Sequence, residues 1–120
     1  MFFKKSKKVN KRVVCPITLI MSLIQETIDI DAGCIELTFI FKNEKHKVGM
    51  ISDYNHKQGF FDPLFFIDKQ EFDTFEKFKL QAFLGGDLFA NMTDDVEIIE
   101  ADDGVTKFPW YTAFEKYVVD

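Results

Sequence analysis

Residues 35–41 read IELTFIF, and this stretch decides the fold class because an apolar residue occupies every second position. Successive side chains of a β-strand point to opposite faces, so the alternation predicts a strand with one buried face. Residues 43–45 are polar and interrupt the pattern, and residues 46–52 then predict the partner strand of a hairpin. Gly49 inside that partner indicates a bulge or a close approach of two backbones. The rest of the chain is placed around this hairpin.

The segment before the hairpin predicts a helix over about residues 16–29. Its apolar residues recur three and four positions apart, which places them on one stripe of a helix. Pro16 suits the first helical turn and Gly33 suits the stop. Residues 27–30 also alternate as a strand would, so both interpretations stay open there. The stripe consists of Ile17, Ile20, Met21, Ile24 and Ile28.

Residues 53–63 hold many turn formers and predict a loop, which a short strand over 64–67 follows. The spacing of Phe72, Phe75 and Phe78 then predicts a second helix. These elements continue the chain away from the hairpin without any Gly/Ser/Pro-rich linker.

The C-terminal third predicts a strand over 95–101, a hairpin turn at Asp103-Gly104 and a helix over 109–119. The helix rests on aromatic residues that lie four and three positions apart. We therefore expect an α+β fold, with an antiparallel sheet of four or five strands and helices packed mainly on one face. An N-terminal and a C-terminal helix are part of this expectation.

Length and composition bound the class of protein. The chain has 120 residues, of which 47% are hydrophobic and 29% are charged, as in one ordinary globular domain. We interpret residues 1–12 as a basic leader and residues 13–120 as a single α+β domain. These figures exclude a multidomain enzyme, a collagen-like chain and a disulfide scaffold.

The formal net charge of −5 is unevenly distributed. The first 12 residues carry six bases and no acid, a charge of +6, which leaves −11 for residues 13–120. Such opposite charges predict either a contact between leader and body or two separate partner surfaces. Two further interpretations of the leader are a solvated tail and a segment that contacts an anionic membrane. Nucleic-acid binding is not expected, because the body is acidic and Arg12 is the only arginine.

An acidic run is the most conspicuous candidate surface. It lacks the glycine at the sixth position that a calcium loop requires, so that motif is excluded, and a loose divalent site at Asp102-Asp103-Gly104 is a minor alternative. The run is interpreted as a solvated strand face, with a docking surface for a basic protein as the functional alternative. Its carboxylates are Asp94, Asp95, Glu97, Glu100, Asp102 and Asp103.

Phenylalanine is the second outlier, with 15 residues in the chain against 3 Tyr and 1 Trp. Core packing explains most of them. The doublets Phe60-Phe61 and Phe65-Phe66 fit one buried face less well, because adjacent strand residues point to opposite faces. One member of each doublet is therefore a candidate for an exposed aromatic residue, at a partner or dimer interface.

No catalytic, cofactor-binding or metal-ligating set is identified. Cys15 and Cys34 have no zinc-type spacing, and we interpret them as free thiols. The loop around His56, with Asp53 nearby, is the only enzymatic candidate, and His46 is interpreted as a cross-strand polar residue.

The basic start followed by apolar residues 13–24 resembles a secretion signal. Pro16, Thr18 and Ser22 interrupt the stretch, and no small-x-small cleavage site closes it. Twelve residues are also too short for a membrane-spanning helix, which needs about 20. We expect a cytoplasmic protein that is not an integral membrane protein.

Three functions remain open on the sequence alone. The first is a small non-enzymatic domain that binds a protein partner of basic character through the acidic face. It is similar in size and charge alone to bacterial immunity and antitoxin proteins. The second is a small-molecule- or metal-dependent enzyme that uses the His56 loop. The third is a homo-oligomeric structural protein with a Phe-rich interface.

Overall fold

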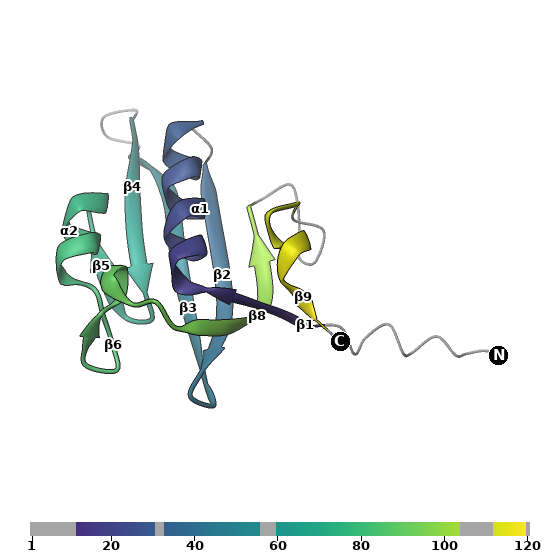
Figure 1. Ribbon diagram of the computed structural model, residues 1–120. Helices are drawn as coiled ribbons and strands as arrows, with labels where there is room; N and C mark the ends of the chain where they lie inside the picture. Colours follow the sequence, from purple (N-terminus) through teal and green to yellow (C-terminus); the bar gives the residue numbers. More distant parts are fainter. Residues whose placement is uncertain (1–11, 31–32, 56–59, 104–111, 120) are drawn as a thin grey trace.

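A seven-stranded antiparallel sheet is the framework of the chain (Figure 1), in a computed structural model that describes residues 12–30, 33–55, 60–103 and 112–119. The strand order is β5-β4-β3-β2-β8-β1-β9, so the first described strand lies between the two last ones. The strands are β1 (Arg12–Pro16), β2 (Cys34–Phe41), β3 (Glu44–Asn55), β4 (Phe60–Ile67), β5 (Gln70–Phe72), β8 (Asp95–Asp102) and β9 (Val118–Val119).

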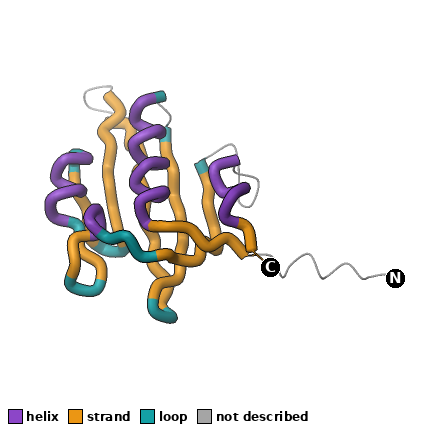
Figure 2. Tube along the Cα trace, in the orientation of Figure 1, coloured by secondary structure: helices purple, strands orange, loops and turns teal. Residues whose placement is uncertain are grey.

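Two α-helices, α1 (Ile17–Asp29) and α2 (Phe75–Gln81), lie on the same side of this sheet (Figure 2). Two 3-10 helices, η2 (Phe89–Asn91) and η3 (Thr112–Tyr117), complete the helical content of the described residues. A separate two-stranded hairpin follows α2 and consists of β6 (Phe83–Leu84) and β7 (Asp87–Leu88).

The predicted hairpin is confirmed as β2 and β3. Its turn residues, Lys42 and Asn43, have φ angles of 52° and 66°. Two-residue turns with positive φ match the right-handed twist of the strands they join. Burial alternates along β2 at every position from Cys34 to Phe41, with the odd-numbered residues buried. The alternation read in the sequence is thus the alternation between the two faces of the sheet.

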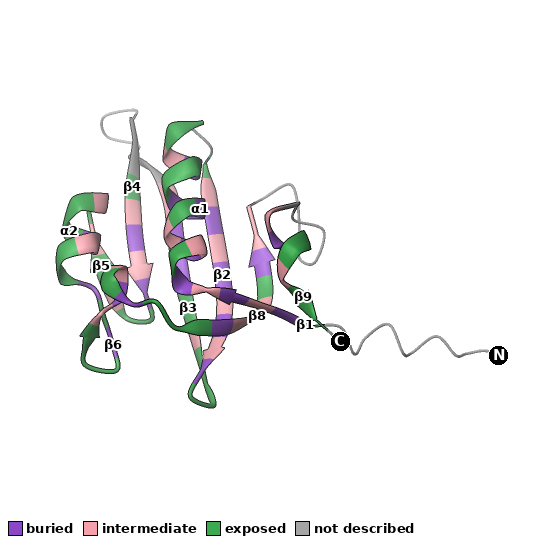
Figure 3. Cartoon of the chain, in the orientation of Figure 1, coloured by how far each residue is buried: buried purple, intermediate pink, exposed green. Residues whose placement is uncertain are grey.

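The core lies between the sheet and the helices (Figure 3). Inward strand residues such as Leu37 and Phe39 are fully buried, as are Ile20 and Ile24 on α1. Phe78 on α2 is also fully buried, and four phenylalanine rings surround it with centroids 5.9–6.4 Å away. These rings belong to Phe65, Phe72, Phe75 and Phe89.

Gly49 occupies a place in β3 that no larger residue can take. A Cβ atom at this position would collide with the carbonyl oxygen of Ile35 and would lie 3.0 Å from the Cα atom of Glu36. The sequence predicted a close backbone approach here, and the structure confirms it.

The expected architecture is wrong in strand number and in its terminal elements. The sheet has seven strands rather than four or five, and the described chain begins with strand β1, not with a helix. The C-terminal residues form η3 and strand β9 where a helix was expected. Strands β5 and β9 have three and two residues, which is too short for any periodicity to indicate them.

The local predictions have mixed outcomes. The helix expected over residues 16–29 is found as α1, and the strand expected over 95–101 is found as β8. The loop expected over 53–63 is wrong, because β3 extends to Asn55 and β4 begins at Phe60. Pairing between these two long strands outweighs the turn propensity of their residues. The hairpin turn predicted at Asp103-Gly104 lies partly outside the described residues.

Candidate functional site

The sheet has a second face, which the described helices leave uncovered. We call it the outer face and define it by the strand residues that alternate with the buried ones. Its apolar members are half-buried rather than buried, in contrast to their inward neighbours. These apolar members are Val14, Ile40, Ile51, Leu64, Phe66 and Ile99.

Carboxylates gather on the outer face along β2 and β8. We call this group the acidic strip: Glu36 on β2, and Glu97, Glu100 and Asp102 on β8. The register pairs Glu36 with Asp102, so two acids face each other across the strand boundary. Like charges directly opposite are unfavourable in a sheet, so their placement here is not explained by stability.

A bulge shapes the strip. The β2–β8 register shifts between Thr38 and Phe39, which leaves Ile99 without an opposite residue. Bulges bend a strand and redirect its side chains. Beside this bulge lies a hollow of about 340 Å³, lined by Glu36, Thr38, Lys47, Ile99, Glu100, Ala101 and Asp102.

Two of these acids have contacts with Arg12 and Thr38. Arg12 at the start of β1 lies 3.6 Å from Glu97, measured from Nη1 to Oε1. The hydroxyl of Thr38 donates a 3.3 Å hydrogen bond to Glu100. Lys47 reaches the rim of the hollow. Both groups of the Arg12–Glu97 pair are partly exposed, so their attraction is weak and screened by salt.

The pKa of the Cys34 thiol depends on the charges of this surface. Burial raises the pKa of its thiol, and the carboxylates of Asp102, Glu36 and Asp103 raise it further. Cys15 faces the core instead, where burial raises the pKa of its thiol to about 12, with a contribution from Asp95. Both thiols therefore stay protonated at neutral pH, which does not suit a nucleophile.

Next to the acidic strip the outer face turns apolar. We call Ile51 on β3 with Leu64 and Phe66 on β4 the apolar patch. Gly49 lies between strip and patch, because the register pairs it with Glu36 on one side and with Phe66 on the other. One cross-strand row therefore reads Asp102, Glu36, Gly49, Phe66, Glu71.

The structure distributes the sequence-predicted acidic residues over more than one location. Glu97, Glu100 and Asp102 belong to the strip, and Asp95 begins the same strand. Asp94 precedes β8 and its carbonyl oxygen accepts a hydrogen bond from the N–H of Ile17 at 2.9 Å. Asp103 follows the strand, near Cys34.

The aromatic doublets are only partly described. Phe65 is 3% exposed and packs against Phe75 and Phe78, whereas Phe66 points to the outer face and is half-buried. Phe60 and Phe61 lie in β4, but their side chains are outside the described part of the structure. The His56 loop and the side chain of Asp53 are outside it as well.

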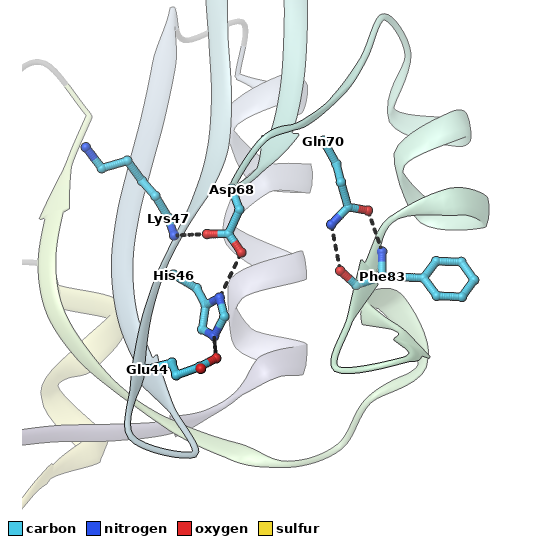
Figure 4. A network of polar contacts seen from close by, with 6 residues as sticks. All are labelled: Glu44, His46, Lys47, Asp68, Gln70 and Phe83. Atoms are coloured by element: carbon cyan, nitrogen blue, oxygen red, sulfur yellow. Dashed lines mark hydrogen bonds and ion pairs between the residues drawn. The ribbon is translucent and has the colours of Figure 1, made fainter.

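His46 belongs to a polar network at the edge of the helix-covered face (Figure 4). Its Nδ1 lies 2.7 Å from Oδ2 of Asp68, and its Nε2 lies 3.9 Å from Oε1 of Glu44. The other oxygen of Asp68 accepts a hydrogen bond from the N–H of Lys47 at 3.0 Å. His46 thus joins β3 to the β4–β5 turn, and its ring packs on Phe39 at 5.4 Å.

Cys34 does not complete this histidine–carboxylate pair as a nucleophile. Cys34 pairs with Ile51, five positions along β3 from His46, and its side chain lies on the opposite face. Figure 4 also shows a pair of hydrogen bonds that we call the Gln70 clasp. The side-chain amide of Gln70 makes these two bonds, of 2.8 and 2.9 Å, to the backbone of Phe83. This clasp attaches the β6–β7 hairpin to β5.

The sequence pattern did not single out Glu36 as part of a site. The β2–β8 pairing brings it next to Asp102, which is 66 positions away in the chain. Its place on the polar side of an alternating strand was the only signal in the sequence.

The described part of the chain contains no group of three or more His, Cys, Asp or Glu side chains that could hold a metal ion. None of its described helices is long and apolar enough to cross a membrane. No family model, curated protein or solved structure matches this chain significantly.

Proposed function

We propose that this protein is a non-enzymatic binding domain whose outer face binds a basic, partly apolar segment of a protein partner. The observation that carries the proposal is the sheet face that the described helices leave uncovered, on which the acidic strip and the apolar patch lie side by side.

The chemistry of the face supports a basic protein segment over a small ligand. Its charge would attract a cationic partner from a distance and accelerate association. The half-buried side chains of the apolar patch would then lose their remaining contact with water, which stabilises the complex by about 25 cal/mol per Å² of apolar surface buried. Neither part requires a cofactor or a reacting group.

The proposal is tested by an NMR titration of the full-length ¹⁵N-labelled protein. The probe is a synthetic peptide of about ten residues with four lysines and two adjacent phenylalanines. We expect chemical-shift changes that concentrate in β2, β3 and β8, and an affinity that falls steeply as salt increases. A peptide in which glutamate replaces each lysine should not bind.

A matched pair of variants connects the binding to the strip. Glu36→Gln with Glu100→Gln should weaken peptide binding at least about fivefold, because each removes a charge from the hollow. Glu76→Gln with Asp87→Asn changes the net charge equally at exposed positions on α2 and β7, and should have little effect. Equal effects of the two pairs, or shift changes centred on the helices, would overturn the proposal.

A further inference from the structure

We infer that the basic leader of this chain docks on its own outer face, with its lysines on the acidic strip and Phe2-Phe3 on the apolar patch. The inference deepens the proposed function, on which it rests: the leader would be a tethered competitor for the partner. Three features of the described residues support it.

The first feature is the point at which the leader joins the sheet. Strand β1 runs antiparallel to β8, with Val13 paired with Ile98 and Cys15 paired with Val96. The start of β1 therefore lies beside the end of β8, where Glu100 and Asp102 are. Arg12, the last residue of the leader, already contacts Glu97 of the strip.

The second feature is charge complementarity. The leader carries Lys4, Lys5, Lys7, Lys8 and Lys11 and no acid. The strip beside its attachment point contributes four carboxylates, and Arg12 already forms an ion pair with one of them, Glu97. The lysines would reduce the repulsion between Glu36 and Asp102, which face each other directly.

The third feature is that the order of residues in the leader matches the order of groups on the face. Going from β1 to β4 the strands follow as β1, β8, β2, β3, β4. Moving outward from Arg12, the leader presents lysines first and Phe2-Phe3 last. Along the row the face presents acids first, then Gly49, and then Phe66. Phe2-Phe3 can therefore contact Phe66 only if the leader crosses the strands along this row.

The length of the leader allows this crossing. Neighbouring strands lie about 4.8 Å apart, so β4 is about 19 Å from β1. The nine Cα-to-Cα steps from Phe3 to Arg12, fully extended, span up to about 30 Å.

Tethering makes even a weak contact effective. A short flexible linker gives an effective concentration in the mM range. A leader that binds with a dissociation constant of similar or smaller size would therefore occupy the face for much of the time. A partner would have to displace it, and its apparent affinity would fall accordingly.

Paramagnetic relaxation enhancement in the full-length chain tests the docking directly. A nitroxide is attached at Ser6→Cys in a Cys34→Ser background, since buried Cys15 with its raised pKa does not label. We expect broadening of β2, β3 and β8 at low salt, and its loss at about 1 M salt, where the screening length is about 3 Å. Glu36→Gln with Glu100→Gln should reduce the broadening, and Glu76→Gln with Asp87→Asn should not.

Three outcomes would overturn the inference. The first is broadening centred on α1 and α2, and the second is broadening that both pairs of variants change equally. The third is seen in a mixture of two samples, one spin-labelled without ¹⁵N and one ¹⁵N-labelled without a spin label. In that mixture, broadening of the ¹⁵N signals would come from a different chain. The last outcome would assign the face to a second copy of the chain.

Competition separates this inference from the proposed function. A full-length variant with Lys4→Gln, Lys5→Gln, Lys7→Gln and Lys8→Gln should bind the basic peptide at least about threefold more tightly. Phe2→Ala with Phe3→Ala, which leaves the charge unchanged, should shift affinity in the same direction by a smaller factor. If the peptide binds the strip but neither variant changes its affinity, the docking is wrong and the proposed function stands. If the leader docks but no variant binds the peptide, the proposed function is wrong.

Discussion

The two faces of the sheet are built from the same strands, residue by residue in alternation, yet they differ in what they pack against. The inner face is a continuous core with α1 and α2, and its residues are buried to within a few percent. The outer face carries apolar side chains too, but they stay half-buried between carboxylates. The comparison indicates that stability resides on the inner face and that the composition of the outer face has another reason.

The doublet Phe65-Phe66 gives the sharpest form of this comparison, because the two side chains differ only in the face to which they point. Phe65→Ala should lower the free energy of unfolding by about 3–5 kcal/mol, since it leaves a cavity between Phe75 and Phe78. Phe66→Ala should lower it by about 1 kcal/mol or less. Urea denaturation measures both. Equal losses would show that the outer face is part of the core.

Gly49→Ala is expected to have the next largest effect. The added methyl group meets the backbone of Ile35, so the hairpin must deform, at a loss of about 1–3 kcal/mol in the free energy of unfolding. Gly33→Ala is the matched control, because nothing lies within 4 Å of a Cβ atom there. A stability of Gly49→Ala equal to that of the control would contradict the close approach of β2 and β3.

Cys15 on the inner face makes stability depend on alkaline pH. Its pKa is raised from about 9 to about 12, so the folded state holds its proton more tightly than the unfolded state does. The stabilisation is complete below pH 9 and is lost as the pH rises toward 12, by about 1 kcal/mol at pH 10. Cys15→Ala removes this contribution. Parallel pH curves of the free energy of unfolding for both proteins would refute the prediction.

The smallest effect is on the reactivity of Cys34. The acids around it raise its pKa, so Glu36→Gln should lower that pKa and accelerate alkylation by iodoacetamide about twofold. Added salt should accelerate the wild type in the same direction. Glu71→Gln, on the distant strand β5, should leave the rate unchanged. If Glu36→Gln and Glu71→Gln behave alike, the acids of the strip do not act on the thiol.

Elements with their own periodicity could be predicted, and those without it could not. The β2–β3 hairpin alternates and α1 has a helical stripe, so both were found in the sequence. Strand β1 was missed because Val14 is as apolar as its buried neighbours Val13 and Cys15, which removes the alternation. The predicted C-terminal helix was wrong because residues three apart, such as Phe114 and Tyr117, also share a face in a 3-10 helix. Pairing with Arg12 and Val13 then places the last described residues in β9.

The candidate site shows the same division. The run of acids from Asp94 to Asp103 is local in the chain, so composition reveals it. The addition of Glu36, the opposition of Glu36 and Asp102, and the row through Gly49 to Phe66 depend on strand order. No local pattern encodes which strands become neighbours.

The sequence by itself determined the alternation of the hairpin, the separation of a +6 leader from a −11 body, and the excess of phenylalanine. Only the tertiary structure decided that β1 enters between β8 and β9, which attaches the leader beside the acidic strip. It also decided which face α1 and α2 cover. The physical reason is that periodicity and charge belong to neighbours in the chain, whereas strand order is set by hydrogen bonds and burial between residues far apart.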